Sequence, residues 1–173
     1  MSEITKCINE WNAIIEALGQ GKQTILIRKI NTTKKEFLLY PTISYTIKEN
    51  ILDSFQDEYK NFVKENLSPS GENRTYEVKY FAKIDEVIEK SSSRIGAFNK
   101  FHIWTKEHVK NYLGRKSAKI WILRVYKLEK PQKLKRSNGM VYANVNKPVK
   151  LEGTPVLNDN EFKKLKNEIL KTR

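Results

Sequence analysis

The sequence predicts an α+β fold, a curved and mostly antiparallel β-barrel with helices at its periphery. Three observations lead to this class. Strand-like segments follow one another with only loops and short helices between them, which is typical of antiparallel architectures. Amphipathic helical patterns stand near both ends of the chain. The repeated strand–helix–strand units that a doubly wound sheet requires are missing. A length of 173 residues suits one domain, so residues 1–173 are expected to fold as a single unit.

The first predicted element is an amphipathic helix over residues 3–18. Its apolar positions recur at spacings of three, four and seven, and Gly19 follows them as a helix-ending signal. These positions are Ile4, Cys7, Ile8, Trp11, Ile14, Ile15 and Leu18. Because Trp11 lies on this stripe, core packing is the first interpretation of its indole ring, ahead of base stacking.

A β-hairpin is predicted over residues 22–40. The aliphatic run 24–27 is followed by polar, turn-like residues and then by a second apolar run that ends at Pro41. Proline stops this run because it cannot donate to a sheet ladder. The hairpin would carry two cations, Arg28 and Lys29, at one of its ends.

The later elements are predicted from clearer patterns. Helices are expected over 49–66, 106–113 and 159–171, with the last one packed on the barrel. Alternating side chains predict a long strand over 74–89. The strand 119–128 is apolar on both faces, so it is expected to be central and covered on both sides.

The composition predicts a nucleic acid as the partner. Lys and Arg number 33 against 20 Asp and Glu, and the resulting net charge of +13 attracts polyanions. One cysteine and two histidines are too few for a disulfide or for the usual zinc sites, so no metal and no cofactor are expected. No apolar run approaches the ~18 residues that span a bilayer, and no signal-peptide pattern opens the chain. We therefore expect a cytoplasmic protein without a membrane partner, and its oligomeric state is left open.

Several blocks of the sequence resemble a known prokaryotic family. The segments 11–22, 26–29, 37–42, 101–105, 123–126 and 154–157 are similar to blocks of the family catalogued as domain of unknown function 1802. The resemblance covers nearly the whole chain. The family name implies no activity.

A second, shorter resemblance is to the ASCH domains of the PUA-like superfamily. Their opening motif has a glycine followed by lysine, glutamate and arginine at fixed spacing, and residues 21–28 are similar to it. Leu26 stands where the motif has its acid, and Gln23 stands at a lysine position. The resemblance implies a pseudo-barrel that binds RNA or a modified base in a cleft, while the two departures argue against the hydrolytic chemistry of some ASCH proteins.

The candidate site joins the hairpin end to an aromatic and basic segment, because these are the two places where cations and aromatic rings coincide. Rings stack on bases, and lysines contact phosphates. The PUA-like resemblance implies that both places lie on one side of the barrel. The predicted nucleic-acid-binding residues are Arg28, Lys29, Tyr40, Thr42, Lys100, Phe101, His102, Trp104 and Lys106. The alternative is structural: Phe101 and Trp104 would pack the short helix onto the barrel, and the two hairpin cations would be solvated.

Two other functions stay open at this point. Glu77 and Lys79 have the Glu-x-Lys spacing of metal-dependent nucleases, with Asp53, Asp57 or Glu58 as a further carboxylate. No catalytic residue is assigned, because this spacing is common by chance in a lysine-rich chain. The second alternative is a protein-interaction module whose charge keeps it in solution.

Overall fold

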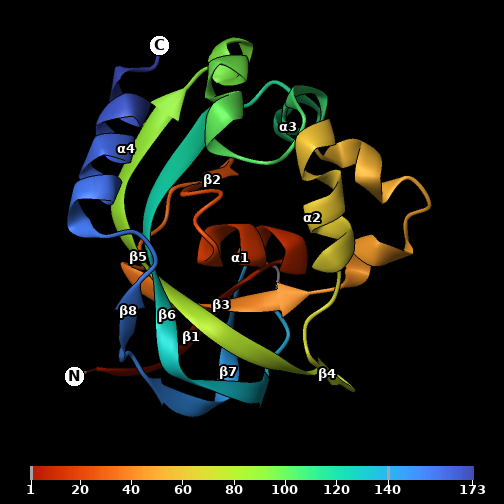
Figure 1. Ribbon diagram of the computed structural model, residues 1–173, viewed down its shortest axis with the longest axis vertical. Coiled ribbons are helices and arrows are strands. Elements are labelled where there is room, and N and C mark those ends of the chain that lie inside the picture. The colour runs from red at the N-terminus through yellow and green to blue at the C-terminus, as the bar shows by residue number, and fades with distance from the viewer. Residues whose placement is uncertain (1, 140) are drawn as a thin grey trace.

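The computed structural model describes residues 2–139 and 141–173 and shows an α+β protein built on an eight-stranded sheet (Figure 1). The strands are β1 (Glu3–Trp11), β2 (Ile25–Arg28), β3 (Glu36–Thr42), β4 (Gly71–Glu72), β5 (Thr75–Lys90), β6 (Ala118–Lys135), β7 (Tyr142–Lys150) and β8 (Gly153–Pro155). The helices are α1 (Asn12–Gly19), α2 (Lys60–Glu65), α3 (Lys106–Leu113) and α4 (Asp159–Lys171). Short 3-10 segments cover η1 (Ser44–Ile47), η2 (Ile51–Ser54), η3 (Asp57–Tyr59) and η4 (Ser92–Phe101).

The main path of the sheet runs β2-β6-β5-β3-β1-β7, with β4 on β5 and β8 on β6. The pairs are antiparallel except β1 with β3, which is parallel. No ladder joins β2 to β7 in the described residues, so the sheet is not closed. Its curvature nevertheless brings the end of β6 beside β7, where Arg136 forms an isolated bridge with Val145. Ser137 N also donates to Asn144 O at 2.8 Å.

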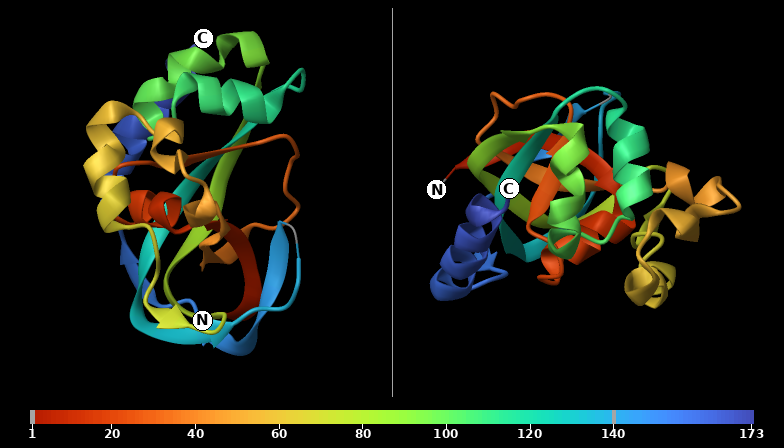
Figure 2. Two further views of the ribbon diagram at one scale, coloured as in Figure 1. Left: turned by 90° about the vertical axis from the view of Figure 1, so that its right-hand side faces the viewer. Right: turned by 90° about the horizontal axis from the view of Figure 1, so that it is seen from above.

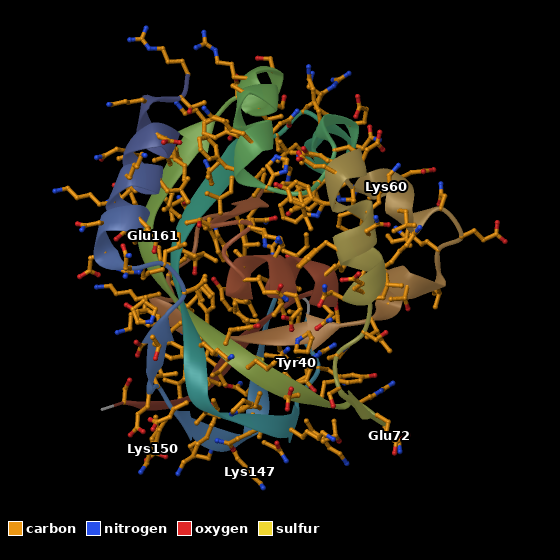
Figure 3. All side chains as sticks on the ribbon, viewed as in Figure 1. Tyr40, Lys60, Glu72, Lys147, Lys150 and Glu161 are labelled. Carbon is orange, nitrogen blue, oxygen red and sulfur yellow. The ribbon has the colours of Figure 1, made fainter. Side chains whose placement is uncertain are left out.

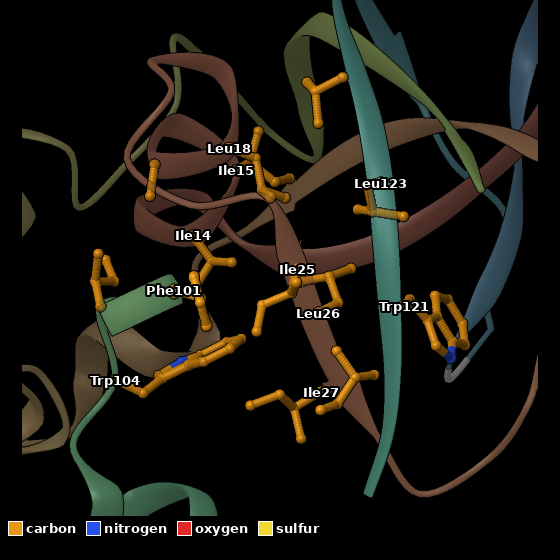
Figure 4. Packing of buried hydrophobic residues seen from close by; sticks show 14 of the residues in the cluster. Ile14, Ile15, Leu18, Ile25, Leu26, Ile27, Phe101, Trp104, Trp121 and Leu123 are labelled. Carbon is orange, nitrogen blue, oxygen red and sulfur yellow. The ribbon is translucent and has the colours of Figure 1, made fainter. Parts of the chain in front are cut away.

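The core occupies both faces of this sheet. One cluster packs α1 and β2 against β6 and includes Ile14, Leu26 and Leu123 (Figure 4). The other cluster includes Cys7 and Leu38. In β3, Phe37 and Leu39 belong to the first cluster and Leu38 and Tyr40 to the second, as the alternation of side chains along a strand requires. β6 lies between β2 and β5, and its successive residues from Ile120 to Leu123 are all buried, so it is central and covered on both sides as predicted.

The first predicted helix is wrong over most of its length. Residues 3–11 form β1, and only residues 12–19 are helical. β1 lies between two partners, β3 and β7, and its neighbouring residues Cys7 and Ile8 are both fully buried, one in each cluster. A strand with apolar residues on both faces has no period of two, so its spacing imitated a helix.

The predicted hairpin is also wrong, although both of its strands exist. β2 pairs with β6, whereas β3 pairs with β1 and β5. The polar segment between β2 and β3 therefore connects two separate parts of the sheet.

The helices outside the first half follow their predictions more closely. α3 covers 106–113 with Thr105 as its N-cap, and α4 covers 159–171 behind an Asn158 capping box. The pattern at 49–66 is divided into η2, η3 and α2. It is interrupted because Phe55 forms a β-bridge with Trp104. α4 and α2 flank the sheet on opposite sides (Figures 1 and 2). Among the described residues no helix combines the length and the apolar character needed to cross a bilayer.

Candidate functional site

A cavity of about 440 Å³ opens where β1, β2 and β3 end. The parallel pairing of β1 and β3 sets Trp11 beside Thr42, and β2 ends at Arg28. One face of α3 and the segment after β6 complete the walls. The lining residues are Asn9, Glu10, Trp11, Ile27, Arg28, Thr42, Ser44, Trp104, His108, Val109, Tyr112, Arg136, Gly139 and Val141.

The cavity contains a largely buried ion pair. Arg28 Nη2 lies 2.6 Å from Glu10 Oε2, and the side chains are 14% and 8% exposed. The other carboxylate oxygen of Glu10 accepts a hydrogen bond from Trp11 N at 2.8 Å. Burial opposes the charge of Arg28, but the carboxylate of Glu10 outweighs this effect, so the pKa of Arg28 is raised and the guanidinium stays charged.

Aromatic rings form much of the wall. Trp11 is stacked on Tyr45, with ring centroids 4.8 Å apart and planes 6° apart. Burial raises the pKa of Tyr45 to about 12, and its hydroxyl is fixed because it donates to Leu67 O at 2.7 Å. Trp11 also lies 5.3 Å from the ring of His108. The ring of Trp11 is thus held in place at the cavity.

α3 contributes His108, Val109 and Tyr112 from one face, since Tyr112 follows the other two by four and three residues and such residues share a face of a helix. Burial lowers the pKa of His108, and the nearby charge of Lys48 lowers it further while Glu10 opposes the shift. His108 is therefore neutral at pH 7. Tyr112 is 38% exposed and is available to a ligand that enters from solvent.

Three cations lie in the wall of the cavity or next to its lining residues. Lys29 Nζ lies 4.6 Å from the centroid of Tyr112, Lys48 acts on His108, and Arg136 lines the wall. In the described part of the chain no carboxylate lies within ion-pair distance of these three side chains. We call Lys29, Lys48 and Arg136 the cationic rim.

The predicted aromatic segment is mostly part of the core. Phe101, His102 and Trp104 are 4%, 1% and 5% exposed, and only Trp104 reaches the cavity. Gln56 Nε2 lies 2.9 Å from three carbonyl oxygens of this segment, and the side chain of Gln23 accepts from Ile103 N at 3.1 Å. Burial lowers the pKa of His102 to about 4, and neither ring nitrogen has a partner in the described residues.

The other predicted residues are distributed around the molecule. Arg28 and Thr42 line the cavity, and Lys29 belongs to the cationic rim. Tyr40, labelled in Figure 3, is 1% exposed and lies in the second core cluster, where its hydroxyl donates to Leu134 O at 2.6 Å. It does not line the cavity, although the guanidinium of the lining residue Arg136 lies 5.6 Å from its ring. Lys100 lies over the ring of Phe101 at 5.2 Å. Lys106 is exposed at the start of α3 and does not line the cavity.

Sequence reasoning missed Glu10, Tyr112, His108 and Arg136. Glu10 was assigned to a helix, although an acid inside an apolar run next to Trp11 is a signal of a buried pair. Trp11 was interpreted as core; it packs against the core and also lines the cavity.

The two residues of the Glu-x-Lys pattern, Glu77 and Lys79, lie on β5 and are not part of the cavity. Lys79 Nζ forms an ion pair with Glu16 Oε2 at 2.7 Å, and Glu77 lies opposite Lys133 on the β5–β6 ladder. Within residues 2–139 and 141–173 no group of three His, Cys, Asp or Glu side chains could hold a metal ion.

The architecture is that of a curved-sheet α+β protein with an aromatic and cationic cavity at the strand ends. The chain belongs to the family described as domain of unknown function DUF1802, whose model matches residues 7–168. A search of curated proteins finds no match.

Among solved structures, the chain is similar to the ASCH protein of Zymomonas mobilis. The TM-score is 0.46 at 13% identity, over 94% of this chain and 93% of that one. Two point mutants of the same protein give TM-scores of 0.48 and 0.45 at 13% and 14% identity, each over 94% of this chain and over 94% and 96% of theirs.

Proposed function

We propose that this chain is a nucleic-acid-binding protein of PUA-like type that takes a base of RNA or DNA, unmodified or modified, into the cavity. The observation that carries the proposal is the coincidence, at one opening, of aromatic walls, a guanidinium and a cationic rim. These are the groups that stack on bases, bind base edges and bind phosphates.

The aromatic walls suit a flat ligand. A volume of about 440 Å³ lies within the range of ~300–1,000 Å³ that is typical of small-molecule sites. Trp11 is held by Tyr45 beneath it, so little ring motion is lost when a base stacks. The partly exposed ring of Tyr112 offers a second platform nearer the mouth.

The cationic rim suits the phosphates on either side of an inserted base. Lys29, Lys48 and Arg136 come from three separate segments, and each is next to the cavity or lines it, while Arg28 is already paired with Glu10. The rim and the net charge of +13 lead to an expected affinity that falls with salt concentration.

The curved sheet supports the PUA-like part of the proposal. The end of β6 returns to β7 through the Arg136–Val145 bridge, as the wall of a pseudo-barrel would. In such a barrel the cavity would lie at one end, among the strand termini.

The test is a binding titration with labelled single- and double-stranded RNA and DNA at about 50 and 200 mM salt. Tyr112→Ala should weaken binding about tenfold or more through lost stacking. Lys29→Gln and Lys48→Gln should each lower the salt slope by about 1. Lys163→Gln and Lys164→Gln on α4 are matched controls that should leave the salt slope and affinity nearly unchanged.

Absence of binding at about 50 mM salt to all of these probes would overturn the proposal. A protein-interaction module would then be the better description. Binding that Tyr112→Ala does not change would place the nucleic acid on another surface.

A further inference from the structure

We infer that the cavity selects guanine among the nucleobases, through the largely buried Glu10–Arg28 pair in its wall. This inference rests on the proposed function and adds to it the identity of the bound base. It follows from which hydrogen-bonding positions of the pair are already occupied and which are left for a ligand.

The guanidinium keeps donors for a ligand. Arg28 uses Nη2 for Glu10, and no hydrogen bond in the described residues uses its Nε or Nη1. The raised pKa of Arg28 keeps all of these nitrogens protonated. A guanidinium with two free N–H directions recognises two adjacent acceptors, and O6 and N7 of guanine are such a pair.

The carboxylate keeps acceptor capacity. Glu10 accepts one bond on each oxygen, from Trp11 N and from Arg28, and each carboxylate oxygen has a second lone pair. The pair therefore presents donors and acceptors side by side on one edge of the cavity. Guanine has the complementary order, with acceptors N7 and O6 followed by donors at N1 and N2.

The other bases fill fewer of these positions. Along the same edge adenine has its N6 amino donor between two acceptors, N7 and N1, so it opposes a donor to the guanidinium and an acceptor to the carboxylate, whereas cytosine and uracil have no N7. The buried environment increases the difference, because a charged group that is left without its partner loses water without compensation.

The test uses the wild-type chain and labelled single-stranded oligouridylates that carry one central guanosine, adenosine, cytidine or uridine. The guanosine probe should bind about 5-fold to 100-fold tighter than the other three. Replacing guanosine by inosine removes the N2 donor, and replacing it by 7-deazaguanosine removes the N7 acceptor. Each replacement should cancel part of the preference.

A variant pair assigns the preference to Arg28. Arg28→Lys keeps the positive charge but cannot form the two parallel bonds, so it should bring the four affinities close together and retain the salt slope. Lys29→Gln should weaken all four probes alike and keep the preference for guanosine.

Equal affinity for the four probes, or a preference for another base, would overturn this inference and leave the proposed function standing. Absence of binding by all four would overturn both. The comparison of bases on the wild-type chain decides the matter even if Arg28→Lys folds poorly.

Discussion

The Glu10–Arg28 pair makes a quantitative prediction about stability. Glu10→Leu leaves a mostly buried guanidinium without its carboxylate, since both side chains are at most 14% exposed. Removing one partner of a buried pair costs ~3–5 kcal/mol. The double variant Glu10→Leu/Arg28→Met removes the orphaned charge, so its loss should shrink to the unsatisfied Trp11 N–H, which is worth ~1–3 kcal/mol.

Urea unfolding at pH 7, followed by tryptophan fluorescence, measures these values. The matched control is Asp159→Ala, because Asp159 pairs with Arg124 at 2.9 Å but is 93% exposed; its loss should stay within ~1 kcal/mol. The reasoning is refuted if Glu10→Leu costs no more than this control, or if the double variant is as unstable as the single one.

Three further predictions concern the core. Trp104→Ala should lower stability by ~3–5 kcal/mol because the ring is 5% exposed; a melting temperature near that of wild type would contradict this. Gly19→Ala should cost ~1–3 kcal/mol, although alanine favours helices, because the new Cβ would lie 2.1 Å from the Tyr80 ring; urea unfolding that shows a stabilised variant would be contrary evidence. Burial lowers the pKa of His102 to about 4, so on acidification His102 is protonated in the unfolded chain before it is protonated in the folded one. The free energy of unfolding should therefore fall by about 3 kcal/mol as the pH drops from ~6.5 to ~4. His102→Phe should remove that part of the pH dependence in urea titrations between pH ~4 and ~7, and an unaltered profile would show that His102 is not its source.

Capping residues and apolar patterns predicted the helices and strands whose bounds depend on neighbouring residues in the sequence. The bounds of helices α3 and α4 were predicted correctly because their N-caps, Thr105 and Asn158, are residue types that favour that position. The central strand was recognised from its apolar residues on both faces, but β6 continues to Lys135 through Pro131. Pro131 is exposed and carries no register pair in the β5–β6 or β6–β8 ladders, so its missing N–H is no obstacle.

Contacts between strands that are far apart in the sequence could not be predicted in this way. β1 and β2 are not neighbours in the sheet, yet Glu10 at the end of β1 meets Arg28 at the end of β2, and no spacing within either segment encodes that contact. Leu26, at the acidic position of the ASCH-like motif, is fully buried, and the carboxylate beside Arg28 comes from β1 instead. The prediction grouped Arg28, Thr42, Trp104 and Tyr40 from their chemistry. The first three line the cavity, whereas Tyr40 is part of the second core cluster.

The position of β1 has a consequence for biosynthesis. β1 is held between β3 and β7, and its partner Tyr142 follows Ile8 by about 130 residues. At roughly 5–20 residues per second, the ribosome releases β7 on the order of 10 s after β1. During that interval β1 has an open edge, and Asn9, Glu10 and Trp11 lack the wall formed by Gly139 and Val141. The cavity therefore takes shape only when the last third of the chain has emerged, so a nascent chain stalled before β7 should already hold helix α1 and still lack the complete cavity.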